Sequence, residues 1–314
     1  MGRLIALKDI KKVCCKVPAT SANLGSGFDI FGLSLPLYNK YVAYINPELK
    51  KPTIIVRGLG KGIIETNEVN LVYQSIKTAA KYLKLKINLK QIVLDLSYAI
   101  PLCGGLGSSS TAVVGGIILA CKLGNKQITK DQLFNLASKL EGHPDNVAPC
   151  IYGGICSCFK DAKNTFQYLP LNYKKNLKIV INCPINFQLK TAKARAILPQ
   201  SYSRADLVHS IERVTLFINA LNNDHRHWLK ESVIDKIHQP YRAKLIPGFN
   251  EIVKASYQHG SYAAFLSGSG ATTAAFCNNK DSKNICQAVK KIYQKHHLNV
   301  KQYVFSINAK GVIY

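Results

Sequence analysis

A glycine-rich turn that runs directly into a series of hydroxyl side chains constrains this chain more than any other segment. Residues 101–111 are Pro101, Leu102, Cys103, Gly104, Gly105, Leu106, Gly107, Ser108, Ser109, Ser110 and Thr111. Glycines allow backbone conformations and close approaches that other residues cannot adopt. If a helix starts at the serines, its unpaired N–H groups and its dipole favour a bound anion, and the hydroxyls can bind phosphate oxygens or a magnesium ion. The competing interpretation is a plain turn with a Ser/Thr helix cap, because the segment lacks the Gly-Lys-Ser/Thr ending of a Walker A loop.

Length and composition indicate a folded chain with a substantial core. The 314 residues are enough for two domains, and 47% of them are hydrophobic. The first residues have no apolar stretch followed by a small-residue cleavage site, as a secretory signal would, and no segment reaches the roughly 18 apolar residues of a membrane helix. We therefore expect a cytoplasmic protein without a membrane partner, in which most of the ten cysteines are small buried side chains.

The formal net charge of +25 raises the possibility of a nucleic-acid partner. Only seven of the 42 basic residues are arginines, however, and the lysines are spread over the whole chain. Proteins that read bases and phosphates use arginine for its planar, bidentate fork. We expect no nucleic-acid partner, although a basic field also attracts an anionic nucleotide.

The order of apolar and polar residues predicts an α+β chain in two halves. Strands are expected at residues 42–45, 53–56, 92–96, 178–182, 265–270 (ending in a turn) and 303–307. Helices are expected at residues 70–83, 108–123, 131–141, 203–222, 224–237, 247–259 and 285–296. The pattern of the sequence changes after Gly153 and Gly154. We place the domain boundary between residues 160 and 176, giving domains 1–168 and 169–314.

The glycine-rich segment resembles the second motif of the GHMP kinases, P-x-x-x-G-L-G-S-S. Four further segments resemble homoserine kinases in particular, in the expected order: KVPATSANLGSGFDIFGL (16–33), GHPDNVAP (142–149), QPYRAKLIPGF (239–249) and FLSGSGATT (265–273). This resemblance implies a two-domain fold, with an N-terminal α+β domain like ribosomal protein S5 and a ferredoxin-like α+β domain after it. It also implies ATP as phosphate donor, Mg²⁺, L-homoserine as acceptor in threonine biosynthesis, and a homodimer.

In the first motif the resemblance implies that Asn23 and Asp29 hold the amino and hydroxyl ends of homoserine. From the residues alone, Asp29 beside a glycine-rich turn could instead brace that turn. Asn70 matches a residue of the adenine pocket, and a helix N-terminus is its plain alternative. Residues 101–111 and Asn70 are thus the predicted ATP site.

GHPDNVAP implies that His143, Asp145 and Asn146 lie along the substrate pocket, while Glu141 and Ser109 together hold Mg²⁺. A carboxylate and a hydroxyl are suitable hard ligands for that ion. Taken without the resemblance, the same segment could be a polar turn that ends a helix.

Arginine is the natural partner of an amino-acid carboxylate, because it forms two parallel hydrogen bonds. Arg195 and Arg242 match the positions that bind this carboxylate in the family. Thr191, four residues before Arg195, faces the same pocket if that stretch is helical.

Three residues are predicted to be catalytic: Asn146, Asp145 and Thr191. The PATSANLG stretch of the first motif has no lysine, whereas many relatives that act on mevalonate or sugars resemble PGK there. Asn146 occupies a position that resembles a catalytic aspartate in some relatives, so the implied mechanism lacks a strong general base. The nearest alternative is a GHMP kinase for mevalonate or a sugar, which the PATSANLG motif and the two arginines disfavour. The alternative of another class is a nucleic-acid-binding protein on the same fold, suggested by the net charge.

Overall fold

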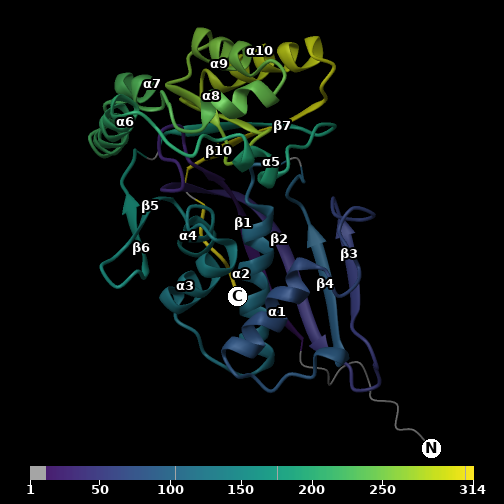
Figure 1. The fold of residues 1–314 in the computed structure, drawn as a ribbon. Coiled ribbons are helices and arrows are strands. Elements are labelled where there is room, and N and C mark those ends of the chain that lie inside the picture. Colours follow the sequence, from purple (N-terminus) through teal and green to yellow (C-terminus); the bar gives the residue numbers. More distant parts are fainter. Residues whose placement is uncertain (1–11, 103, 175, 308) are drawn as a thin grey trace, which may run out of the picture.

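The computed structural model describes residues 12–102, 104–174, 176–307 and 309–314. Figure 1 shows that these form two units, one above the other, each with its own sheet. Cys103, which belongs to the predicted phosphate loop, lies outside the described residues. In the described part of the chain no helix has the length and apolarity needed to cross a membrane.

The first unit is a mixed sheet covered on one face by helices (Figure 1). Its strands are β1 (Val13–Ala22), β2 (Phe31–Ile45), β3 (Thr53–Gly58), β4 (Ile92–Tyr98), β5 (Ile155–Lys160) and β6 (Phe166–Leu171). They run in the order β3-β4-β2-β5-β6, with β1 paired to β2. The helices are α1 (Leu71–Tyr82), α2 (Ser108–Leu123), α3 (Lys130–Glu141) and α4 (Val147–Tyr152), with the short 3-10 turn η1 (Leu89–Gln91) before β4. α2 is buried along nearly all its length, because its residues are almost all small or apolar.

The second unit has four antiparallel strands in the order β10-β7-β9-β8. These are β7 (Lys178–Pro184), β8 (Ala263–Leu266), β9 (Thr273–Cys277) and β10 (Val300–Ser306). The helices are α5 (Thr191–Ala196), α6 (Arg204–Asn222), α7 (Leu229–Ser232), α8 (Gln239–Arg242), α9 (Phe249–Gln258) and α10 (Ser282–Lys295), with 3-10 turns η2 (Arg226–Trp228) and η3 (Ala243–Leu245). Helices connect β7 to β8 and β9 to β10, which gives the β-α-β-β-α-β arrangement of a ferredoxin-like sheet.

Most predicted elements are confirmed within a few residues, including α2 and α6. The predicted helix at 224–237 is wrong: only η2 and α7 form there, and the chain leaves helical geometry after Ser232. The side chain of Asp235 accepts the backbone N–H groups of residues 237, 238 and 239, which holds a tight turn in place of another helical turn. Sequence reasoning also missed β1, β5, β6 and β9.

One apolar cluster joins the two sheets. It contains Leu33 of β2, Ile181 of β7, Phe217 of α6 and Phe276 of β9, all fully buried. The change from the first sheet to the second occurs between Leu171 and Lys178, while the predicted boundary after residue 168 lies within β6. That boundary stays a prediction.

Candidate active site

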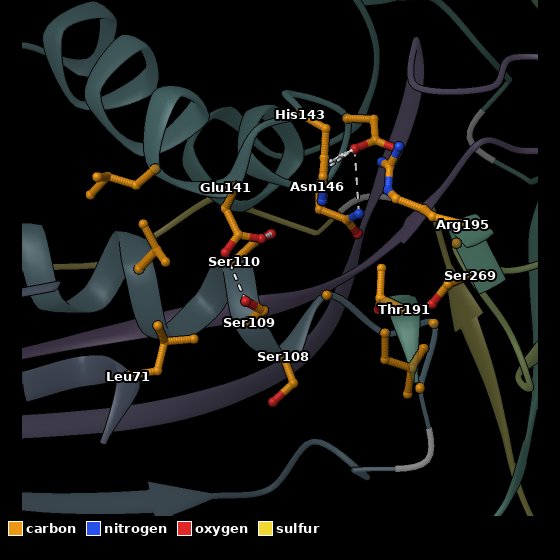
Figure 2. Close-up of a pocket in the computed structure, with 18 of the residues that line it drawn as sticks. Leu71, Ser108, Ser109, Ser110, Glu141, His143, Asn146, Thr191, Arg195 and Ser269 are labelled. Atoms are coloured by element: carbon orange, nitrogen blue, oxygen red, sulfur yellow. Dashed lines mark hydrogen bonds and ion pairs between the residues drawn. The ribbon is translucent and has the colours of Figure 1, made fainter. Parts of the chain in front are cut away.

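A cavity of about 630 Å³ lies where the two units meet. One side of its wall comes from the first unit: α1, the start of α2, and the segment from the end of α3 to the start of α4. The other side comes from α5 and the turn after β8. Figure 2 shows Ser108, Ser109 and Glu141 at one end of this space, with Arg195, Thr191 and Ser269 at the other.

The glycine-rich loop takes its shape from close backbone contacts. Gly107 has a φ of +65° and precedes α2 directly, and a Cβ there would stand 1.9 Å from the hydroxyl oxygen of Thr20. Gly105 has a φ of +82°, and a Cβ there would lie 2.3 Å from the carbonyl oxygen of Ser267. Because Gly107 has no side chain to cap the helix, it leaves room for an anion at the first turn of α2.

Two serines at the start of α2 contact one carboxylate at the end of α3, next to this loop. Ser109 Oγ donates to Glu141 Oε1 and Ser110 Oγ donates to Glu141 Oε2, both at 2.7 Å. Glu141 is the last residue of α3, which ends at Gly142 in a left-handed conformation. The predicted pairing of Ser109 with Glu141 is thus present, and Ser110 joins it. Ser108 also lines the cavity (Figure 2).

The GHPDNVAP segment places three polar side chains against the loop. His143 Nδ1 donates to Asp145 Oδ1 at 2.7 Å, and the same oxygen accepts the backbone N–H of Asn146 at 2.9 Å. Burial opposes the charged imidazole, but the hydrogen bond and charge of Asp145, helped by Glu141, outweigh it and raise the pKa of His143. Asn146 Oδ1 accepts a hydrogen bond from the Thr20 hydroxyl at 2.7 Å.

At the opposite end, Arg195 and Asp29 form a two-point ion pair. Nη2 of Arg195 lies 2.8 Å from Oδ1 of Asp29, and Nη1 lies 3.1 Å from Oδ2. Thr191 begins α5 one turn before Arg195, as predicted, and its hydroxyl lies 3.2 Å from that of Ser269. Asp29 and Arg195, which are predicted to bind the amino-acid substrate, therefore lie in direct contact at this end of the cavity.

Asn23 and Arg242 lie deeper in the wall. The amide of Asn23 donates to the carbonyl of Gly268 at 2.8 Å, and its oxygen accepts the backbone N–H of Asp29 at 3.0 Å, so its side chain braces the loop. Arg242 is 2% exposed. Burial, followed by the positive charge of Arg195, lowers the pKa of Arg242 to about 10.

Some of the remaining predicted ATP ligands line the cavity, and others lie outside it. Pro101, Leu102, Gly104 and Leu106 line the cavity. Thr111 does not reach it, because α2 turns this residue into the core, where its hydroxyl contacts Asn39 and Tyr41. Asn70 caps α1 through the N–H groups of Val72 and Tyr73 and borders a smaller hollow of about 300 Å³ next to Ser108.

Sequence reasoning missed Thr20, Phe28 and His238, which all lie around this site. Thr20 is in strand β1 and meets Asn146 across 126 residues of sequence. The ring of Phe28 has the guanidinium carbons of Arg242 and Arg195 at 5.2 and 5.7 Å from its centroid. Thr20 and Phe28 lie inside the quoted first motif, so a closer reading of that motif is the one signal that could have found them.

Known proteins are similar to this chain in sequence and in structure. The sequence pattern of the GHMP kinases N terminal domain matches residues 70–154, and that of GHMP kinases C terminal matches residues 207–295. A homoserine kinase of Carboxydothermus hydrogenoformans is 39% identical over 283 residues, which is 90% of each chain. A homoserine kinase of Microchaete diplosiphon is 34% identical over 306 residues, 96% of this chain and 97% of that protein.

A solved structure agrees with these sequence relatives. The crystal structure of homoserine kinase from Cytophaga hutchinsonii has a TM-score of 0.85 to this chain at 27% identity, and the match covers 100% of this chain and 99% of that one. The two-domain α+β fold expected from the sequence is thereby confirmed. This chain belongs to the GHMP kinase family, in its homoserine kinase branch.

Proposed function

We propose that this protein transfers the γ-phosphoryl group of ATP to the hydroxyl of L-homoserine, which yields O-phospho-L-homoserine for threonine biosynthesis. One observation carries the proposal: a single cavity has an anion-binding loop at one end and a paired carboxylate and guanidinium at the other. The ammonium and carboxylate of an amino acid suit Asp29 and Arg195, and its hydroxyl then extends toward the loop.

The chain itself can bind and orient both reactants. The loop at residues 101–110 and the start of α2 receive the phosphates of ATP, since a helix N-terminus beside glycines favours anions. Phosphoryl transfer has a loose transition state, so positioning and charge neutralisation provide most of the catalysis. Arg242 and Arg195 bind the substrate carboxylate, and Thr191 lies beside them.

The oxygen atoms of Ser109, Ser110 and Glu141 fit a magnesium ion. Mg²⁺ prefers carboxylate and hydroxyl oxygens and keeps several waters and phosphate oxygens as its other ligands. Ser109 and Ser110 each donate a 2.7 Å hydrogen bond to Glu141 beside the phosphate loop. When bound, the ion would neutralise charge on the phosphates.

We infer that no strong general base removes the hydroxyl proton. Asn146 carries a neutral amide, and the buried carboxylate of Asp145 is committed to His143 and to a backbone N–H. An Asn146→Asp variant tests this inference, with Asn146→Ala as its control. We expect both to lower the turnover number at neutral pH; a sharp rise with aspartate would show that a base limits the reaction.

Release of ADP with a panel of acceptors tests the proposed function. The acceptors are L-homoserine, L-threonine, L-serine, mevalonate and galactose, each with ATP and Mg²⁺. We expect homoserine to give the highest kcat/KM. Serine and threonine carry their hydroxyl one carbon nearer to the α-carbon, and mevalonate and galactose lack the ammonium group that suits Asp29. Preference for mevalonate or galactose would favour another GHMP kinase activity. The absence of turnover with every acceptor would refute the proposed kinase activity.

Two finer properties stay predictions. Light scattering on the purified protein measures whether it is the homodimer that the family resemblance implies. Fractionation of cells tests the predicted cytoplasmic location.

A further inference from the structure

His238 lies just before α8 and is completely buried. Its Nε2 is 2.7 Å from the carbonyl oxygen of Gly25, and its Nδ1 is 3.3 Å from Nη1 of Arg242. A carbonyl oxygen can only accept and a guanidinium can only donate. The ring is therefore neutral, with its proton on Nε2 and its lone pair on Nδ1 facing Arg242. Burial in fact lowers the pKa of His238 despite the nearby Asp235, which agrees with this neutral form.

Arg242 is held by three acceptors from three different segments. Its Nε donates to the carbonyl of Ala194 at 3.0 Å, and its Nη1 donates both to Gly268 at 3.1 Å and to His238. Within residues 12–102, 104–174, 176–307 and 309–314, Nη2 has no hydrogen-bond partner, although Arg242 lines the cavity. Three contacts fix the plane of the guanidinium, and one NH₂ group is left for a ligand.

Contacts with the ring and the backbone of His238 hold this residue in one position. Its ring stacks on Phe28 with centroids 5.2 Å apart, and Phe28 also lies under the guanidinium of Arg242. Asp235 accepts the backbone N–H groups of His238 and Gln239, at 2.7 and 2.6 Å. The loop that carries Gly25 packs against the same segment, because Ser26 Oγ donates to the carbonyl of Ser232 at 2.7 Å. The Nδ1 lone pair therefore has one fixed direction, toward Arg242.

We propose that His238 is a positioning residue for substrate recognition, because it orients the guanidinium of Arg242 toward the carboxylate of the amino-acid acceptor. This inference rests on the proposed function and identifies a determinant of its specificity. The alternative role is that of a core histidine whose loss only weakens the fold. The two roles differ in whether the loss depends on the carboxylate of the acceptor.

Asparagine and glutamine at position 238 separate the two contacts of the ring. In His238→Asn the side-chain oxygen can take the place of Nδ1 and accept from Arg242, but nothing reaches Gly25. In His238→Gln the amide can take the place of Nε2 and donate to Gly25, but the acceptor for Arg242 is gone. We expect the KM for homoserine to rise about tenfold in His238→Gln and to stay within about threefold in His238→Asn, since hydrogen bonds to charged groups are the stronger ones. The KM for ATP should not change in either variant.

L-Homoserinamide, which has a neutral amide in place of the carboxylate, supplies the decisive comparison. We expect His238→Gln to lose about tenfold in kcat/KM with homoserine and less than twofold with the amide. An equal loss with both acceptors, or equal behaviour of the two variants, overturns the positioning role. If the wild-type protein fails to phosphorylate homoserine, the proposed function itself falls, and this inference with it.

The wild-type protein provides a measurement that needs no variant. With ¹⁵N-labelled histidine, NMR reports the protonation of each ring nitrogen. We expect His238 to stay in the Nε2–H form and its Nδ1 signal to shift when homoserine is added, but not when homoserinamide is added. A charged ring, the opposite tautomer, or equal shifts with both compounds would contradict the proposal.

Discussion

At the scale of single residues, the hydroxyl of Thr20 is the most testable contact of the site. It donates to Asn146 at 2.7 Å and lies against Gly107 of the phosphate loop. In Thr20→Val this donor is lost at nearly constant volume, so the amide of Asn146 can turn. We expect kcat to fall about tenfold, the effect of one hydrogen bond worth about 1 to 1.5 kcal/mol. Thr20→Ser keeps the hydroxyl and should stay within about twofold; steady-state kinetics that show equal losses in both variants would rule out this role.

The same contact shows what sequence can and cannot predict about a site. The resemblance implies that Ser109 and Glu141 lie together, and the structure places them 2.7 Å apart, while their binding of Mg²⁺ stays a prediction. Thr20 and His238 are missed, because the resemblance assigns them no role and their partners lie 126 and 213 residues away along the chain. Thr111 was taken for a ligand although it is buried in the core, because a motif does not show which face of its helix a residue occupies.

At the scale of elements, the approach of α1 to α2 sets where the phosphate loop lies. A Cβ at Gly116 of α2 would come 2.5 Å from Cβ of Ser75 and 2.8 Å from the carbonyl oxygen of Val72, both on α1. Gly116→Ala gains about 1 kcal/mol in helix propensity but forces the helices apart, and overpacking of this kind typically costs 1 to 3 kcal/mol. We expect a net loss in the free energy of unfolding, measured with urea, and a higher KM for ATP.

A second substitution checks the cause of that loss. Ser75→Gly in the Gly116→Ala protein removes the nearer contact and should restore part of the stability. The glycine introduced at position 75 itself lowers the helix propensity of α1. A loss from Gly116→Ala that is as large in the Ser75→Gly background as in the wild-type background would show that the contact with Ser75 is not the cause.

Elements differ in how far the sequence determines them. The strong apolar periodicity of α10 and the hydroxyl-rich start of α2 predicted these helices to within a few residues. The segment at 224–237 has a helical pattern as well, yet Asp235 holds a turn, and Leu229 and Val233 are buried in the apolar cluster between the two sheets. There the tertiary contacts override local preference, and the turn at Asp235 brings His238 within hydrogen-bond distance of Arg242.

At the scale of the whole molecule, the cavity exists because the two units are fixed to each other. The apolar cluster that includes Leu33 and Ile181 joins the two sheets. The chain after β10 returns to the first unit as well: Ile313 pairs with Lys16 of β1, and the N–H of Val312 donates to the carbonyl of Cys150 at 2.7 Å. Under the proposed function, the loop of the first unit binds ATP while Arg195 and Arg242 of the second unit bind the acceptor carboxylate, so these contacts between units would determine how closely the reacting atoms approach.

Gly311 is the point at which this returning segment can be loosened. A Cβ there would lie 2.1 Å from the carbonyl oxygen of Ile151, so Gly311→Val has to push the segment away from the first unit. We expect a loss on the order of 2 kcal/mol in the free energy of unfolding and a lower kcat, both because the units are held less firmly. Lys310→Ala is the matched control, since its side chain is exposed and Tyr38 contacts only its carbonyl oxygen. Calorimetry and kinetics should show the control close to wild type. A Gly311→Val protein with unchanged unfolding temperature and kcat would contradict this role. The apolar cluster between the sheets would then be sufficient to hold the two units in place.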